Sequence, residues 1–248
     1  MKRADELLAE RGLAESRSKA RAIIEEGRAF CGGEKIDKPS RKLPLDAEIR
    51  VDKNADALKF VSRAGLKLDG FLSDANLDVS GFDILDIGAS TGGFTDCLLS
   101  RGAKSAVCVD VGTGQLHEKI KADPRVLNLE KTDARNLTSA MLNGALFDFI
   151  CADLSFISLE KVIPHIWGFL RRGGYAAFLV KPQFETEPRF LRRTKGVLKD
   201  DALRGAALEK IKKFVAENFA DAVYVCDSPS KIAGGDGNRE YLLLLKKS

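Results

Sequence analysis

The second part of the chain alternates short apolar runs with polar or helix-like segments. From about Phe60 onward, seven apolar runs predict strands, at Ile84–Ile87, Ala106–Val109, Val126–Leu129, Phe147–Ala152, Ala176–Val180, Ala222–Cys226 and Tyr241–Leu245. Leu159–Leu170 and Ala202–Asn218 are predicted helices. This alternation predicts a mostly parallel sheet with helices on both faces. The last two runs are joined by a polar segment without a helix, so we expect an antiparallel hairpin there.

The first 53 residues have a different pattern. Apolar residues with helical spacing predict two short helices, one containing Ala4, Leu7 and Leu8 and one containing Ala20, Ile23 and Ile24. Ser16 or Ser18 is a candidate N-cap of the second helix, Gly27 is its stop, and two strand-like pieces follow, at 29–36 and 43–51. We therefore expect a small α+β domain at 1–53, a linker at 54–59 and an α/β domain at 60–248.

Composition narrows the class of protein. The 248 residues are 44% hydrophobic and 31% charged, which is typical of a soluble globular protein. The net charge of +4 is compatible with nucleic acid but does not indicate it. Five cysteines without a C-x-x-C pair predict reduced core residues, and two histidines without ligand spacing predict no metal site. A charged N-terminus and the lack of a long apolar run predict a cytoplasmic protein without membrane contact.

The segment Phe82–Asp96, FDILDIGASTGGFTD, predicts a strand, a glycine-rich turn and the start of a helix. Its glycines, at 88, 92 and 93, do not have the G-x-G-x-x-G spacing of dinucleotide sites. An acid at the strand end followed by this turn suits S-adenosylmethionine, which has an amino-acid tail and no phosphate. The alternative is an ordinary turn of a doubly wound α/β fold. The predicted cofactor contacts of this turn are Asp86, Gly88, Ala89, Ser90, Thr91, Gly92, Gly93 and Phe94.

Three more acids follow the next predicted strands, where ligands of open α/β sheets bind. A carboxylate at Asp110 could accept the ribose hydroxyls of an adenosine, and Asp133 could bind the adenine amine. Asp153, after the fourth strand, could also contact the cofactor. For each acid alone, a helix N-cap is about as plausible as a function.

Lys181 directly follows five apolar residues and precedes Pro182. A partly desolvated lysine, or one beside another cation, has a lowered pKa and can act as a general base. The alternative is a lysine whose stem is buried and whose amine reaches solvent. Asp153 could orient this amine, whereas Lys67 and Glu240 would each pass alone for ordinary surface charges.

Basic residues gather in two places. Between residues 189 and 199 there are five basic and no acidic residues. The first 53 residues hold 13 Lys or Arg and 11 Asp or Glu, so only clustering on one face would indicate RNA binding; a solvated helix face is the alternative. The candidate RNA contacts are Arg3, Arg11, Arg17, Lys19, Arg21, Arg28, Arg63, Arg189, Arg192 and Arg193.

Two resemblances organise these features. Residues 7–51 resemble the S4 RNA-binding domain, with CGGEKI where that domain usually has V-N-G-x-x-V. From Lys59 onward the chain resembles the TlyA family of ribosomal RNA (cytidine-2′-O)-methyltransferases, within the FtsJ-like class. The matching stretches are KFVSRAGLKLDGFL, LDIGASTGGFTDCLLSRGAK, VDVGTGQL, DPRV, DLSFISL, LVKPQFE and GNREYLLLL. SRAG, VGTG and RRTKGVLKD depart from the family pattern.

The second resemblance implies a Rossmann-like, seven-stranded methyltransferase sheet that binds S-adenosylmethionine. It also implies a catalytic tetrad of Lys67, Asp153, Lys181 and Glu240, with ribosomal RNA or ribosomal subunits as partner and a monomeric enzyme. Two alternatives stay open: an RNA-binding or haemolysin-like protein without methyltransferase activity, and an RNA base methyltransferase. DLSF in place of N/D-P-P-Y/F and the position of Cys151 within an apolar strand disfavour a base methyltransferase.

Overall fold

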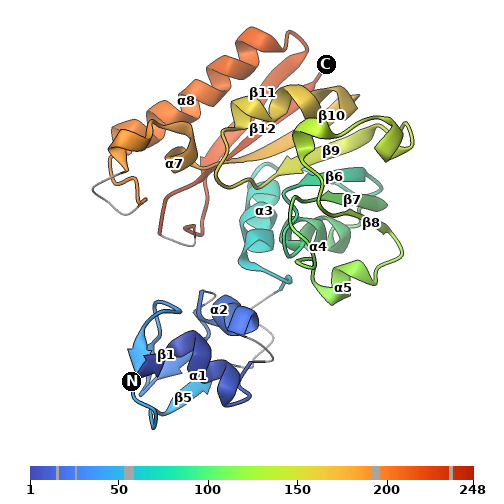
Figure 1. Ribbon diagram of the computed structural model, residues 1–248. Helices are drawn as coiled ribbons and strands as arrows, with labels where there is room; N and C mark the ends of the chain where they lie inside the picture. Colours follow the sequence, from blue (N-terminus) through green and yellow to red (C-terminus); the bar gives the residue numbers. More distant parts are fainter. Residues whose placement is uncertain (15–16, 26, 53–58, 192–195, 235–236) are drawn as a thin grey trace. The chain divides into compact units, whose positions relative to one another are not determined.

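The computed structural model describes residues 1–14, 17–25, 27–52, 59–191, 196–234 and 237–248 (Figure 1). The chain divides into two compact units, Met1–Lys59 and Phe60–Ser248. The predicted linker adjoins this division, and its residues 54–58 lie outside the described residues.

The N-terminal unit is a small α+β fold. Its elements are β1 (Lys2–Arg3), α1 (Ala4–Glu10), α2 (Arg17–Glu25), β2 (Ala29–Cys31), β3 (Glu34–Lys35), β4 (Lys42–Leu43) and β5 (Ile49–Val51). β2 pairs antiparallel with β3 and β5, and β1 pairs with β4. Gly32 and Gly33, with φ of +56° and +88°, form the two-residue β2–β3 turn, in which both residues need positive φ. Ser18 is the second residue of α2, so it does not cap that helix, and Ser16 lies outside the described residues.

The larger unit contains the predicted seven-stranded sheet. Its strands are β6 (Asp83–Ile87), β7 (Ser105–Val109), β8 (Val126–Leu129), β9 (Phe147–Ala152), β10 (Leu170–Val180), β11 (Ala222–Pro229) and β12 (Tyr241–Lys247). They are ordered β11-β12-β10-β9-β6-β7-β8. The pairs from β8 to β10 are parallel, whereas β12 pairs antiparallel with both β10 and β11. The predicted C-terminal hairpin is therefore confirmed.

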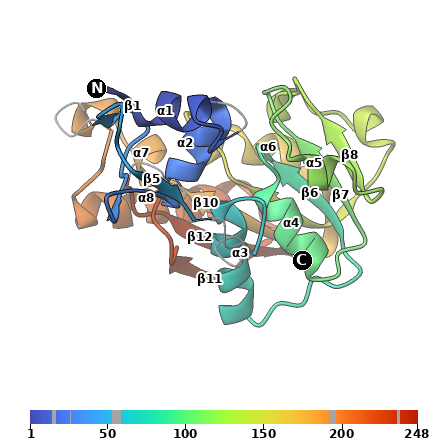
Figure 2. The ribbon, with the colours of Figure 1, turned by 90° about the horizontal axis from the view of Figure 1, so that it is seen from below.

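Helices cover both faces of this sheet (Figures 1 and 2). They are α3 (Arg63–Asp74), α4 (Gly93–Ser100), α5 (Glu118–Lys121), α6 (Ile163–Ile166), α7 (Pro182–Glu185) and α8 (Asp201–Asn218). Successive strand residues point to opposite faces. Accordingly, Leu243 of β12 packs in the cluster that includes α8, and Leu242 in the cluster that includes α3 and α4.

The predicted helix Leu159–Leu170 is wrong as a single element. The structure has a 3-10 turn at Leu159–Lys161, then α6, then a second 3-10 turn at Trp167–Phe169, and Leu170 begins β10. Pro164 accounts for the break, because proline lacks the N–H that a continuous helix would need at this position. The apolar side chains of this stretch are buried nevertheless, which explains the helix-like pattern.

Candidate active site

The carboxyl ends of β6, β9 and β10 meet at one edge of the sheet. In the parallel register Ile87 lies beside Ala152, and Ala152 lies beside Phe178. The residues that follow these strands are therefore neighbours: Gly88 after β6, Asp153 after β9 and Lys181 after β10. A Cβ added to Gly88, whose φ is +76°, would lie 2.7 Å from the carbonyl oxygen of Asp153. Only glycine lets the two loops approach so closely.

A pocket of about 240 Å³ opens at this edge. Its lining residues are Ser62, Ala64, Asp86, Gly88, Ala89, Ser90, Thr91, Gly93, Phe94, Asp153, Ser155 and Lys181. The pocket thus joins the glycine-rich turn to the ends of β9 and β10. A Cβ added to Gly93 would lie 2.1 Å from Ser62 Oγ, so a bare backbone at this position lets the starts of α3 and α4 pack together.

Asp86 is buried under the glycine-rich turn, with 1% of its surface exposed. Its Oδ2 accepts hydrogen bonds from the Thr95 hydroxyl at 2.7 Å and the Thr95 N–H at 3.1 Å. Its Oδ1 is buried without a hydrogen-bond partner, although the residue lines the pocket. Burial raises the pKa of this carboxyl to about 6, against the opposing effect of the Thr95 hydrogen bonds.

Three of the predicted cofactor residues do not line the pocket. Gly92 instead faces Leu116 and Ile120, to which an added Cβ would come within 2.8 and 3.2 Å. Asp110 accepts the N–H groups of Ser90 and Gly112. Asp133 caps the 3-10 turn at Ala134–Asn136 and pairs with Arg135, which lowers the pKa of Asp133. For Asp133 the capping alternative is therefore what the structure shows.

The four tetrad residues form two ion pairs. Lys181 Nζ lies 2.6 Å from Asp153 Oδ1, with 11% and 20% of the side chains exposed. Lys67 Nζ lies 2.6 Å from Glu240 Oε2, and these side chains are 10% and 3% exposed. Lys67 comes from α3, and Glu240 immediately precedes β12. Each amine is thus held by a carboxylate from another part of the chain.

Two residues beside Lys181 were not among the predicted ones. Ser155 lines the pocket, and its Oγ accepts a hydrogen bond from Lys181 Nζ at 3.0 Å. Phe156 is 91% exposed, has a φ of +66° and contacts the Phe184 ring at 5.2 Å between centroids. The available signal was their position directly after a strand-end aspartate in DLSF.

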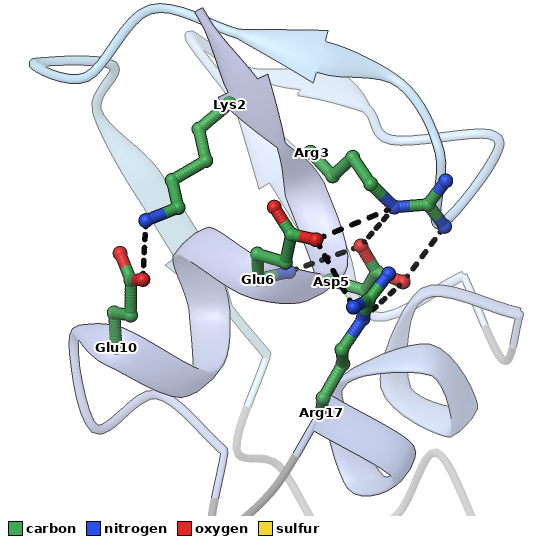
Figure 3. A network of polar contacts seen from close by, with 6 residues as sticks. All are labelled: Lys2, Arg3, Asp5, Glu6, Glu10 and Arg17. Atoms are coloured by element: carbon green, nitrogen blue, oxygen red, sulfur yellow. Dashed lines mark hydrogen bonds and ion pairs between the residues drawn. The ribbon is translucent and has the colours of Figure 1, made fainter.

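Two of the N-terminal arginines surround a buried acid (Figure 3). The Asp5 side chain has no exposed surface, and it accepts both Arg3 Nε and Nη2 at 2.9 Å and Arg17 Nε at 3.2 Å. The hydrogen bonds from Arg3 are the main reason that the pKa of Asp5 is lowered to about 2. Arg17 also pairs with Glu6 at 3.0 Å. Both arginines therefore link α1 to its surroundings, whatever else they bind.

The remaining candidate RNA contacts have varied settings. Arg11 donates to the carbonyls of Leu45 and Ala47, and Arg28 donates to that of Asp52. Arg21 is exposed on α2, and Arg63 is the partly exposed first residue of α3. Arg189 is exposed and pairs with Glu187 at 3.0 Å. The Lys19 side chain, Arg192 and Arg193 lie outside the described part of the chain.

Among the described residues, no group of three or more His, Cys, Asp or Glu side chains could hold a metal ion. No helix in this part of the chain is both long enough and apolar enough to span a membrane.

Comparison with known proteins places the chain in a family. Residues 60–247 match the model of the FtsJ-like methyltransferase, and residues 2–49 match that of the S4 domain. The chain belongs to the FtsJ-like methyltransferase family. The predicted resemblance to the TlyA family is confirmed by relatives of that name that are 39% identical over 98% of this chain. The predicted fold class is confirmed by the seven-stranded, mostly parallel sheet and by the two domain matches.

Two relatives and one solved structure illustrate the match of this FtsJ-like methyltransferase. It is 39% identical to the 16S/23S rRNA (cytidine-2′-O)-methyltransferase TlyA of Mycobacterium tuberculosis, over 98% of this chain and 89% of that protein. It is also 39% identical to Hemolysin A of Brachyspira hyodysenteriae, over 97% of this chain and 98% of that protein. A solved structure of a provisionally named hemolysin from Streptococcus thermophilus has a TM-score of 0.77 and 36% identity, covering 100% of this chain and 88% of that one.

Proposed function

We propose that this protein transfers the methyl group of S-adenosylmethionine to the ribose 2′-oxygen of cytidine in ribosomal RNA. The observation that carries the proposal is the Lys181–Asp153 ion pair, which lines the same pocket as the glycine-rich turn. A ribose 2′-hydroxyl is a weak acid, so methyl transfer to its oxygen needs a nearby base that accepts the hydroxyl proton. The family match and the TlyA relative support both the reaction and the RNA substrate.

The lining of the pocket suits the amino-acid end of the cofactor. Asp86 Oδ1 is a buried acceptor without a partner, and it could receive the cofactor's ammonium group. The backbone of the turn at Ser90 and Thr91, just before α4, could bind its carboxylate. We assign the adenosine end to Asp110, since its carboxylate lies at the end of the adjacent strand β7. Asp133 is the weakest of these assignments, because Arg135 already occupies it.

When bound, S-adenosylmethionine would supply an electrophilic methyl group on a sulfonium. The ribose 2′-oxygen would take this methyl group, and the sulfur would keep the electron pair and leave as S-adenosylhomocysteine. Lys181, in its neutral form, accepts the hydroxyl proton at Nζ. Asp153 and Ser155 fix this amine by the contacts of 2.6 and 3.0 Å. Positioning supplies much of the rate, because the methyl donor is already activated.

Lys67 and Glu240 have a supporting role in this proposal. Glu240 fixes the Lys67 amine, as the 2.6 Å pair indicates, and Lys67 offers positive charge to the target phosphate. The expectation that Lys67 also tunes Lys181 by like-charge repulsion stays a prediction. Since each amine has its own carboxylate, repulsion between the two lysines is reduced.

RNA recognition is assigned to both units. The S4 unit would bind folded RNA by its shape and phosphates, and the basic stretch at 189–199, which follows Lys181 in the chain, would add further contacts. The target nucleotide has to leave its stack to reach the pocket. The exposed Phe156 ring, next to Ser155, could stack against it.

The direct test supplies the protein with labelled S-adenosylmethionine and ribosomal RNA that lacks its 2′-O-methyl groups. Small subunits, large subunits and naked RNA form separate arms, and the product is mapped at nucleotide level. We expect 2′-O-methylcytidine with the wild type and none with Lys181→Met. Methylation on a base, or equal transfer by the variant, would overturn the proposal. Binding of RNA in the absence of any cofactor binding would favour an RNA-binding protein without methyltransferase activity.

A further inference from the structure

The segments that follow β9 and β10 run beside one another. We call residues 153–159 the β9 loop and residues 181–185 the β10 turn. Asp153 and Ser155 contact Lys181, at one end of this pair of segments. In the middle, the Phe156 and Phe184 rings meet at 5.2 Å. The β10 turn therefore contacts the β9 loop along most of its length.

Glu185 makes the contacts at the other end. Its side chain is 2% exposed. Its Oε1 accepts the Leu159 N–H at 2.8 Å, and its Oε2 accepts the Ser158 hydroxyl at 2.5 Å. Both carboxylate oxygens thus bind the β9 loop, four residues after Lys181.

A buried carboxylate at this place has a cost. Burial raises the pKa of Glu185, because the charged form loses its hydration. Lys210 compensates little, since its Nζ is 3.9 Å from Glu185 Oε2 and only 2.6 Å from Glu160 Oε2. The hydrogen bonds that the Glu185 carboxylate accepts from the β9 loop offset this cost of burial. One of them comes from the N–H of Leu159, the first residue of the 3-10 turn Leu159–Lys161, whose N-cap is Ser158.

The β9 loop needs such an anchor. Phe156 has a φ of +66°, a left-handed conformation that is strained for a bulky non-glycine residue. Its ring is 91% exposed, so burial contributes little to holding it. The loop between Asp153 and Ser158 is therefore strained, and it is held at both ends by the β10 turn.

We propose that Glu185 is a positioning residue for methyl transfer, which holds the β9 loop so that Asp153 and Ser155 stay in contact with the Lys181 amine. The inference rests on the proposed function, because it assigns Glu185 to the same catalytic site. Glu185 acts through the loop and does not itself line the pocket.

The test compares Glu185→Gln and Ser158→Ala with the wild type. Glutamine keeps one acceptor oxygen, whereas the serine variant removes the hydroxyl that donates to Glu185 and accepts the Glu160 N–H. Lys210→Met is the control for the nearby cation: it removes the amine that pairs with Glu160 and donates to the Glu185 carbonyl at 3.3 Å, and it leaves both hydrogen bonds that the Glu185 carboxylate accepts from the loop. Single-turnover transfer with enzyme in excess gives a rate constant for the folded molecules only. Cofactor binding is measured by calorimetry.

We expect the single-turnover rate to fall by about tenfold or more in Glu185→Gln, because small misplacements of catalytic groups are costly. The rate of Ser158→Ala should fall less than that of Glu185→Gln. The double variant with both substitutions should have the rate of Glu185→Gln, and the rate of Lys210→Met should stay near that of the wild type. The Kd of the cofactor should change by less than about threefold. A purely structural role would lower the melting temperature without changing this rate constant.

The outcomes separate the two proposals. If the wild type transfers no methyl group to ribose, the proposed function fails. If the wild type is active and Glu185→Gln transfers at the same rate, the positioning role is overturned. A rate loss matched by an equal loss of cofactor affinity would overturn it too. Should Glu185→Gln fail to fold, Ser158→Ala alone decides between the same results.

Discussion

The Lys67 amine lies 2.6 Å from the Glu240 carboxylate, although 173 positions separate the two residues in the chain. The pair links the first turns of α3 to the start of β12, and both side chains are nearly buried. In such surroundings, a charge that loses its partner is left without compensation.

The first prediction follows from this burial. Lys67→Met and Glu240→Gln should each lower the free energy of unfolding by about 3 kcal/mol, because each substitution leaves the other charge buried without its partner. The double variant should lose less than the sum of the single variants. Urea unfolding of the full chain measures all four proteins. Strictly additive losses would show that the pair has no coupling.

The second prediction concerns Lys181. Lys181→Met should lower the methyl-transfer rate by about 10²–10⁴-fold, the usual range for general base catalysis, while cofactor binding stays nearly intact. Ser155→Ala removes only the hydroxyl that accepts the Lys181 hydrogen bond, so we expect a smaller loss. Single-turnover assays and cofactor titrations check both variants. A Lys181→Met protein with more than about a tenth of the wild-type rate would contradict the assignment.

The third prediction uses the buried Asp86. Its pKa is raised from 3.8 to about 6, so the folded state binds a proton more tightly than the unfolded state. This contribution to stability is present below pH 4 and is lost as pH rises through about 6, with a total on the order of 3 kcal/mol. Asp86→Asn lacks the titration and can still accept the Thr95 hydrogen bonds.

The stability of the wild type relative to Asp86→Asn should therefore decline between pH 4 and pH 7. Chemical unfolding at several pH values measures the difference between the two proteins. A difference that is constant over this range would mean that Asp86 titrates normally in the folded state.

The strands, the C-terminal hairpin and the edge where the site lies could be predicted from the sequence. Apolar runs marked each strand, and parallel strands bring their carboxyl ends together, so Asp153 and Lys181 were expected to be neighbours. The Lys67–Glu240 pair could not be predicted in this way. Neither residue stands out in its local pattern, and only the family resemblance brought them together before the structure did.

Other features depend on side-chain contacts that periodicity does not encode. Asp110 and Asp133 follow strands equally, yet Asp133 pairs with Arg135 while Asp110 binds the backbone of the glycine-rich turn and its own loop. The left-handed conformation of Phe156 has no sequence signal, since the residues that prefer it are glycine and asparagine. Likewise, the sequence predicts Arg3 and Arg17 only as RNA contacts, and its pattern does not indicate that they share Asp5 as a partner.

The last prediction tests that partner. Asp5→Asn removes a buried carboxylate that binds Arg3 in a bidentate manner and also binds Arg17. The pKa of Asp5 is lowered from 3.8 to about 2, so its contribution is present above pH 4 and is lost as pH falls through about 2. Because Arg3 and Arg17 are 37% and 54% exposed, solvent screening reduces this contribution to about 1–2 kcal/mol.

Hydrogen exchange of the full chain at pH 6 should therefore be faster in the variant for peptides from α1 and α2. Peptides from β9 and β10 are the internal control, since Asp5 belongs to the other unit. Equal protection of α1 in both proteins would show that the arginines do not depend on Asp5. The role of the two arginines in RNA binding could then be tested with Arg3→Ala and Arg17→Ala without a loss of fold. Much faster exchange of α1 in Asp5→Asn would mean that these arginine variants lose folding stability, so that a loss of RNA binding could not be assigned to a lost RNA contact.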